Sequence, residues 1–158
     1  MKVLLVYANT YDFLLPPPVG LSLMTEPVRK AGHEVKLVDL MKEKDPDGIL
    51  GAALKAFNPD VVGFSLRNLD NQNYREPEDF VPDYAHWVGM ANEVAPTITG
   101  GSAVMTMSEE LFKRVGATYG MVGQGDKAFP MFLKELQNGA LHATLLLPPG
   151  VPEKAPGE

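Results

Sequence analysis

The stretch KVLLVYANTYDFLLPPPVGLSLM (residues 2–24) combines an apolar segment, a proline-rich loop and the start of a helical pattern. Residues 2–8 are almost continuously apolar, which predicts a strand that is covered on both faces of a sheet. The pattern becomes helical from Pro18 to Ala31, and Gly32 is a natural helix stop. A strand that leads through a loop into a helix is the first half of a parallel strand–helix–strand unit.

The rest of the chain repeats this alternation of apolar strands and helical patterns. We expect further strands at residues 33–40, 59–66, 97–101 and 119–125, and further helices at residues 45–57, 84–94, 108–116 and 127–139. The pattern predicts an α/β fold, a flavodoxin-like (Rossmann-type) three-layer sandwich whose parallel sheet of about five strands has the order 2-1-3-4-5. We expect one domain at residues 1–140 and a C-terminal extension at 141–158 that ends in a proline-rich linker or tail.

Composition excludes several classes of function. The formal net charge of -6 argues against a nucleic acid or an anionic membrane as a partner. No apolar run is long enough to span a bilayer, and the polar residues near the start do not fit a signal peptide, so we expect a cytoplasmic protein. The chain has no cysteine, which excludes an iron–sulfur cluster held by its own thiolates.

In the predicted fold, ligands bind at the carboxyl ends of the strands. The segments at these ends are the loop after Ala8, residues 65–73, residues 100–102 and residues 123–125. Glycines in three of them would let a ligand approach the backbone, although turns that need a positive φ would also explain glycine. The polar residues after the third strand are either functional or a loop that only organises itself.

Familiar ligands of this fold suit these segments poorly. A phosphate needs N–H and hydroxyl donors, but the prolines at 16–18 have no N–H to offer. Ser65 and Leu66 stand where a receiver domain carries an aspartate, and the GxGxxG dinucleotide pattern is absent.

Five segments in order carry a family resemblance: PPPVGLSLM, RKAGHEVKLVDL, PDVVGFSLRNLDN, TITGGSAV and VGQGDKAF. With them, residues 2–136 resemble the N-terminal cobalamin-binding domain of B12-dependent radical SAM enzymes. The resemblance implies that the carboxyl edge of the sheet holds cobalamin, the cobalt-containing vitamin B12. It also implies that the nucleotide tail lies between strands and that the corrin faces a radical SAM domain.

Small residues at the strand ends would give room to that tail, and the apolar loop suits the flat underside of a corrin. We expect no catalytic residue and no protein ligand to a metal. The cofactor-binding candidates are Asn9, Tyr11, Leu14, Leu15, Pro17, Pro18, Gly20, Ser65, Leu66, Arg67, Asn68, Gly100, Gly101, Ser102, Gly123, Gln124 and Gly125.

Many other cobalamin proteins carry an Asp-x-His-x-x-Gly loop whose histidine coordinates cobalt. Placing Gly20 on the last glycine of that loop puts Pro17 at the position of the histidine. The resemblance therefore implies base-off binding without a histidine ligand. His33, His86 and His142 lie in different predicted elements without metal-ligand spacing.

The function expected from this resemblance is that of the cofactor-carrying domain of a radical SAM enzyme of the methyltransferase type. S-adenosylmethionine and a [4Fe-4S] cluster would then sit only on a missing or separate catalytic domain, acting in cis or in trans. Two alternatives remain open at this point. They are a stand-alone cobalamin carrier or sensor, and a cofactor-free flavodoxin-like signalling or interaction domain.

Overall fold

The computed structural model describes residues 1–9, 16–41, 43–106, 108–141 and 145–146. Its elements are, in chain order, β1 (Lys2–Tyr7), α1 (Val19–Lys30), β2 (Glu34–Asp39), α2 (Pro46–Phe57), β3 (Val61–Ser65), α3 (Val81–Asn92), β4 (Thr97–Gly100), α4 (Ser102–Thr106), α5 (Ser108–Val115), β5 (Tyr119–Met121), α6 (Gly125–Gln137) and β6 (Leu145–Leu146). No helix among these residues is long and apolar enough to cross a membrane.

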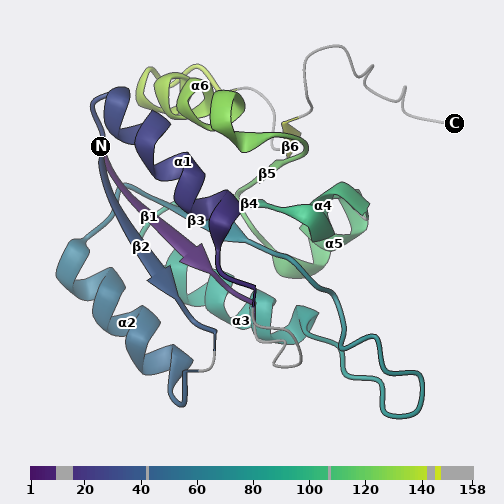
Figure 1. Ribbon diagram of the computed structural model, residues 1–158. Coiled ribbons are helices and arrows are strands. Elements are labelled where there is room, and N and C mark those ends of the chain that lie inside the picture. The colour runs from purple at the N-terminus through teal and green to yellow at the C-terminus, as the bar shows by residue number, and fades with distance from the viewer. Residues whose placement is uncertain (10–15, 42, 107, 142–144, 147–158) are drawn as a thin grey trace, which may run out of the picture.

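The strands form one parallel sheet in the order β2-β1-β3-β4-β5-β6 (Figure 1). The predicted order 2-1-3-4-5 is confirmed, and a short sixth strand is added beyond β5. β6 comes from residues 141–158, which we predicted to lie outside the domain. A strand of two residues is too short to show an alternation pattern, so the sequence does not reveal it.

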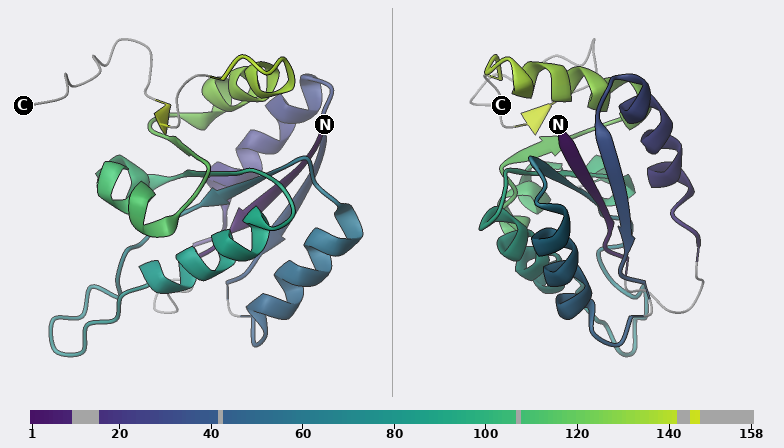
Figure 2. Two further views of the ribbon diagram at one scale, coloured as in Figure 1. Left: turned by 180° about the vertical axis from the view of Figure 1, so that it is seen from behind. Right: turned by 90° about the vertical axis from the view of Figure 1, so that its left-hand side faces the viewer.

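Helices cover both faces of the sheet, as expected for a three-layer sandwich (Figure 2). α1 and α6 lie on one face, and α2, α3 and α5 lie on the other. The side chains of β1 serve the two cores alternately: Val3, Leu5 and Tyr7 pack towards α1 and α6, whereas Leu4 and Val6 pack towards the other layer. This double burial explains the unbroken apolar run with which the chain begins.

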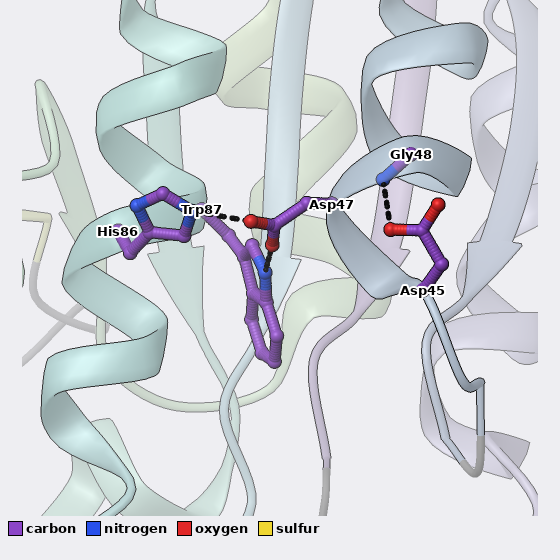
Figure 3. Close-up of polar contacts among 5 residues, drawn as sticks. All are labelled: Asp45, Asp47, Gly48, His86 and Trp87. Atoms are coloured by element: carbon purple, nitrogen blue, oxygen red, sulfur yellow. Dashed lines mark hydrogen bonds and ion pairs between the residues drawn. The ribbon is translucent and has the colours of Figure 1, made fainter.

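Local signals set several helix boundaries. Asp45 precedes α2, and its Oδ1 accepts a hydrogen bond of 2.9 Å from the backbone N–H of Gly48, which satisfies a free donor of the first turn (Figure 3). Asn58, the residue after α2, is in the left-handed conformation, and Gly32 follows α1 with φ +86°. These ends agree with the predicted helices at residues 18–31 and 45–57.

Several elements differ from the prediction. α3 begins at Val81 rather than Tyr84, because Oδ1 of Asp79 accepts a 2.9 Å hydrogen bond from the N–H of Val81. α4 was not predicted, since five residues are too few to show helical periodicity. β5 ends at Met121, and Gly125, which we had assigned to the strand segment, is the first residue of α6.

Candidate functional site

A cavity of about 710 Å³ opens at the carboxyl ends of the central strands, on the face covered by α1 and α6. The sheet forms its floor. Leu21 and Met24 of α1 form one wall, and Phe129 of α6 forms another. The cavity thus lies at the edge of the sheet where this fold places its ligands.

The inner part of the floor is a row of three residues in register, Leu5, Gly63 and Ile98. Apolar side chains converge over Gly63. A methyl group added there would lie 3.0 Å from Cδ2 of Leu5, 3.6 Å from Cζ of Phe129 and 3.7 Å from Cγ2 of Ile98. Leu5, Ile98 and Phe129 are each at least 97% buried, as their exposures of 1%, 3% and 2% show, so this end of the cavity is closed to water.

The next row towards the mouth is Tyr7, Ser65 and Gly100. A methyl group on Gly100 would meet only the carbonyl oxygen of Met121, at 3.6 Å. Gly100 therefore borders open space, and a larger side chain there would project into the cavity. The hydroxyl of Tyr7 donates a 3.1 Å hydrogen bond to the carbonyl of Pro16, which ties the segment before α1 to the end of β1.

The polar lining residues all lie in the accessible part of the cavity. The polar side chains that line the cavity belong to Ser65, Ser102, Gln124 and Asp126, and each of these residues is half-buried or exposed. The fully buried lining residues, by contrast, are all apolar. A ligand that fills the cavity therefore meets polar partners near the mouth and apolar ones inside.

Many of the predicted cofactor-binding residues line this cavity. They include Gly20 of α1 and Ser65 of β3, with Gly100, Gly101 and Ser102 at the end of β4 and Gly123, Gln124 and Gly125 after β5. Gly101 and Gly123 both have φ +103°, so a turn requirement accounts for glycine at these two positions. Gly100 has no such requirement, because its φ is not in the left-handed range.

Other predicted residues are not among those lining the cavity. Leu66 is fully buried in the core on the opposite face, where its N–H donates to the carbonyl of Gly100 and its carbonyl accepts from Ala103. Arg67 is exposed, and its carbonyl accepts a 3.0 Å hydrogen bond from the hydroxyl of Ser102. Both residues shape the backbone beside the cavity.

Asn9 and Asn68 bond to each other instead of lining the cavity. Asn9 is fully buried, and its Oδ1 accepts a 3.2 Å hydrogen bond from Nδ2 of Asn68. The carbonyl of Asn68 accepts a 2.6 Å hydrogen bond from the hydroxyl of Tyr84, and burial raises the pKa of Tyr84, so this hydroxyl keeps the proton that it donates. The pair fixes the ends of β1 and β3 relative to each other.

Pro17 and Pro18 lead into α1, and their carbonyls accept hydrogen bonds from the N–H groups of Val19 and Ser22. Neither proline is among the residues that line the cavity. Tyr11, Leu14 and Leu15 lie outside the described residues. The expected role of the proline-rich loop under a corrin therefore stays a prediction.

The long segment after β3 organises itself. The side-chain oxygen of Asn71 accepts from the N–H groups of Asn73 and Glu78, at 3.0 and 3.2 Å, and its Nδ2 donates to the carbonyl of Glu76 at 2.8 Å. Asp79 forms a 2.6 Å ion pair with Arg114 of α5. These bonds favour the view that this loop holds its own shape.

Sequence reasoning missed most of the apolar lining. Leu5, Ile98 and Phe129 read as ordinary core residues, and so do Leu21 and Met24 at helical spacing. Nothing in a single sequence separates an apolar side chain that faces a cavity from one that packs against another side chain.

A comparison with known families decides the identity. The family model for the B12 binding domain matches residues 7–133, which run from the end of β1 into α6 and include nearly all of the cavity lining. The chain belongs to the B12-binding domain family. Cobalamin is the cofactor of this family.

Two curated relatives of this B12-binding domain are methyltransferases. It is 31% identical over 145 residues to the hopanoid C-3 methylase of Methylococcus capsulatus, and 27% identical over 147 residues to the tryptophan 2-C-methyltransferase of Streptomyces laurentii. The matches cover 86% and 90% of this chain but 26% and 24% of the relatives. The chain therefore spans about a quarter of the length of the curated relatives it matches.

Solved structures agree with this family. The radical S-adenosylmethionine methyltransferase TsrM from Kitasatospora setae superimposes with a TM-score of 0.79 at 26% identity, over 87% of this chain and 26% of that one. One TsrM structure contains cobalamin and a [4Fe-4S] cluster, and another contains tryptophan and an analogue of S-adenosylmethionine. The resemblance found in the sequence is thus confirmed.

The described histidines of the B12-binding domain lie away from the cavity. His33 precedes β2 at the amino end of the sheet, where the N-terminal amine lies 3.4 Å from its Nδ1. His86 lies on α3, on the opposite face of the sheet, and its Nε2 is 2.8 Å from Oδ2 of Asp47 (Figure 3). His142 lies outside the described residues.

Proposed function

We propose that this B12-binding domain holds cobalamin base-off and without a histidine ligand. We further propose that it is the cofactor-carrying domain of a radical SAM enzyme of the methyltransferase type. The observation that carries the proposal is the deep cavity at the carboxyl edge of the sheet, closed at its inner end by Leu5, Ile98 and Phe129. If the nucleotide tail extends into such a cavity, the base at its end cannot coordinate the cobalt of the same cofactor.

The residues present suit that tail. Gly100 leaves space beside the floor, and the half-buried side chain of Ser65 lines the cavity, where its hydroxyl can meet a polar group of the ligand. Ser102 and Gln124 lie nearer the mouth, where the polar parts of a nucleotide would pass. Cobalamin itself would supply the cobalt chemistry, and these side chains would bind and orient it.

Within the part of the chain that the structure describes, three positions support the proposal that no histidine binds the cobalt. Pro17 stands where the resemblance would place a coordinating histidine, and a proline side chain has no lone pair to give. His33 lies at the wrong end of the sheet, and His86 is on the wrong face. Because the chain has no cysteine, we assign the [4Fe-4S] cluster and S-adenosylmethionine to a separate catalytic domain, in cis or in trans.

Two measurements test the proposal. The purified chain is mixed with hydroxocobalamin and desalted, and we expect it to retain the coloured cofactor; a colourless protein would reject cobalamin binding. The EPR spectrum of the bound cob(II)alamin should then lack superhyperfine splitting from an axial nitrogen. Splitting from one nitrogen would reject the base-off, histidine-free mode, and a His86→Ala variant would show whether His86 supplies it.

A further inference from the structure

The apolar character of the buried lining limits what the inner end of the cavity accepts. The buried lining residues Leu5, Ile98 and Phe129 carry no hydrogen-bonding side-chain group, and neither does Leu21, which is 5% exposed. The nearest polar side chain of the floor, Ser65, is two residues further along β3 towards the mouth. A polar group placed over the inner row would therefore lose its water without gaining a partner.

This limit bears on the base at the end of a cobamide tail. Natural cobamides differ in this base. The 5,6-dimethylbenzimidazole of cobalamin carries two methyl groups, whereas adenine carries an exocyclic amine and additional ring nitrogens. Since ribose and phosphate need the polar partners near the mouth, the base is the part of the tail that reaches the apolar end.

We propose that this cavity selects cobamides by their lower base, accepting 5,6-dimethylbenzimidazole and discriminating against adenine. The inference rests on the proposed base-off binding of the tail. Leu5, Ile98 and Phe129 are the specificity-determining residues, because their side chains line the inner end of the cavity with carbon atoms only. An adenine base would leave its amine unpaired against them.

Binding of three corrinoids to the purified chain tests this selectivity. The dissociation constants of hydroxocobalamin, of its adenine analogue adeninylcobamide, and of cobinamide, which has no nucleotide, are measured by equilibrium dialysis. We expect adeninylcobamide to bind roughly tenfold to a hundredfold more weakly than hydroxocobalamin, the range set by one buried unpaired polar group. Cobinamide should also bind more weakly than hydroxocobalamin.

The outcomes separate this inference from the proposed function. Equal binding of hydroxocobalamin and adeninylcobamide would overturn the selectivity while leaving cobalamin binding intact. Equal binding of cobinamide and hydroxocobalamin would overturn it as well, because the tail would then contribute nothing. Failure of all three corrinoids to bind would reject the proposed function itself.

A matched pair of variants tests whether the lower base reaches Ile98. Ile98→Thr places a hydroxyl on the inner row, and Ile98→Val has nearly the same shape without the hydroxyl. We expect the preference for hydroxocobalamin over adeninylcobamide to be several-fold smaller in Ile98→Thr than in Ile98→Val. An equal preference in the two variants would show that the base does not reach Ile98 and would overturn the assignment. If either variant does not fold, the comparison of corrinoids on the native chain still decides the selectivity.

Discussion

The indole N–H of Trp87 donates a 2.7 Å hydrogen bond to Oδ1 of Asp47, which joins α3 to the first turn of α2 (Figure 3). The other carboxylate oxygen of Asp47 lies 2.8 Å from Nε2 of His86 on the same helix. One carboxylate thus connects two helices that cover the same face of the sheet. The hydrogen bonds from His86 and Trp87 lower the pKa of Asp47.

This lowered pKa predicts a pH-dependent contribution to stability. Because the folded state favours ionised Asp47, the contribution is fully present above the ordinary carboxyl pKa of about 4 and is lost as pH falls through the lower folded value. Asp47→Asn should therefore lower the melting temperature at pH 7, and its difference from the native chain should shrink below about pH 4. Glu135→Gln on α6 is the matched control. A difference that stays constant from pH 7 to pH 3 would contradict the linkage.

Gly100 offers a direct test of the cavity. Gly100→Leu should weaken cobalamin binding by at least about tenfold, because the side chain projects into space that is otherwise open. The fold should tolerate it, since only the carbonyl of Met121 lies within 4 Å of an added methyl group. Gly89→Leu on the exposed side of α3 is the control and should bind normally. Normal binding by Gly100→Leu, measured by the same dialysis, would place the tail elsewhere.

Substitution of Gly101, unlike that of Gly100, is expected to affect the fold. From the sequence alone, a glycine at a strand end beside a ligand predicts that Gly101→Leu spares the fold and loses only the ligand. In the structure Gly101 has φ +103°, and a methyl group there would lie 2.5 Å from the carbonyl oxygen of Leu66. Substitution at Gly101 should therefore destabilise the domain itself.

A comparison with Gly32 isolates that effect. Gly32 has φ +86° but nothing within 4 Å of an added methyl group, so Gly32→Ala carries only the backbone strain of about 1–2 kcal/mol. Gly101→Ala should reduce the free energy of unfolding by at least about 1 kcal/mol more than Gly32→Ala, because it adds a steric clash. Urea unfolding of both variants measures the difference, and equal losses would argue against close contact with Leu66.

The purified chain should not cleave S-adenosylmethionine, even after iron and sulfide are supplied under reducing conditions. Radical cleavage needs a cluster held by cysteine thiolates, and the chain has none. The measurement is the yield of 5′-deoxyadenosine by chromatography against a sample without protein. A yield above that background would show that this chain holds a cluster by other ligands.

The fold was largely readable from the sequence because its signals are local. The apolar run of β1 reflects burial on both faces of the sheet, and the mixed pattern of β2 reflects its place at the edge of the sheet. Gly32 and Asp45 mark helix ends through their own backbone and side-chain chemistry. The sequence did not predict α4, because a helix of five residues has too few turns to repeat a pattern.

The site was readable only in part. Glycine and serine at strand ends stand out because few structural roles need them there, and Ser65, Gly100 and Gln124 do line the cavity. The hydrogen bond between Asn9 and Asn68 joins residues 59 positions apart, so no local sequence pattern predicts it. The apolar wall was hidden for the same reason, since whether Phe129 meets a cavity or a neighbour depends on tertiary packing.

The short strand β6 has a consequence for the boundary of the domain. Gly120 and Met121 of β5 pair with Leu145 and Leu146, so these two residues cover one side of β5. A chain cut after residue 140 would leave that side of β5 with bare N–H and C=O groups. An uncovered strand edge is a template on which a second molecule can add its own strand. Such a shortened chain is expected to self-associate, although every residue that lines its cavity would still be present.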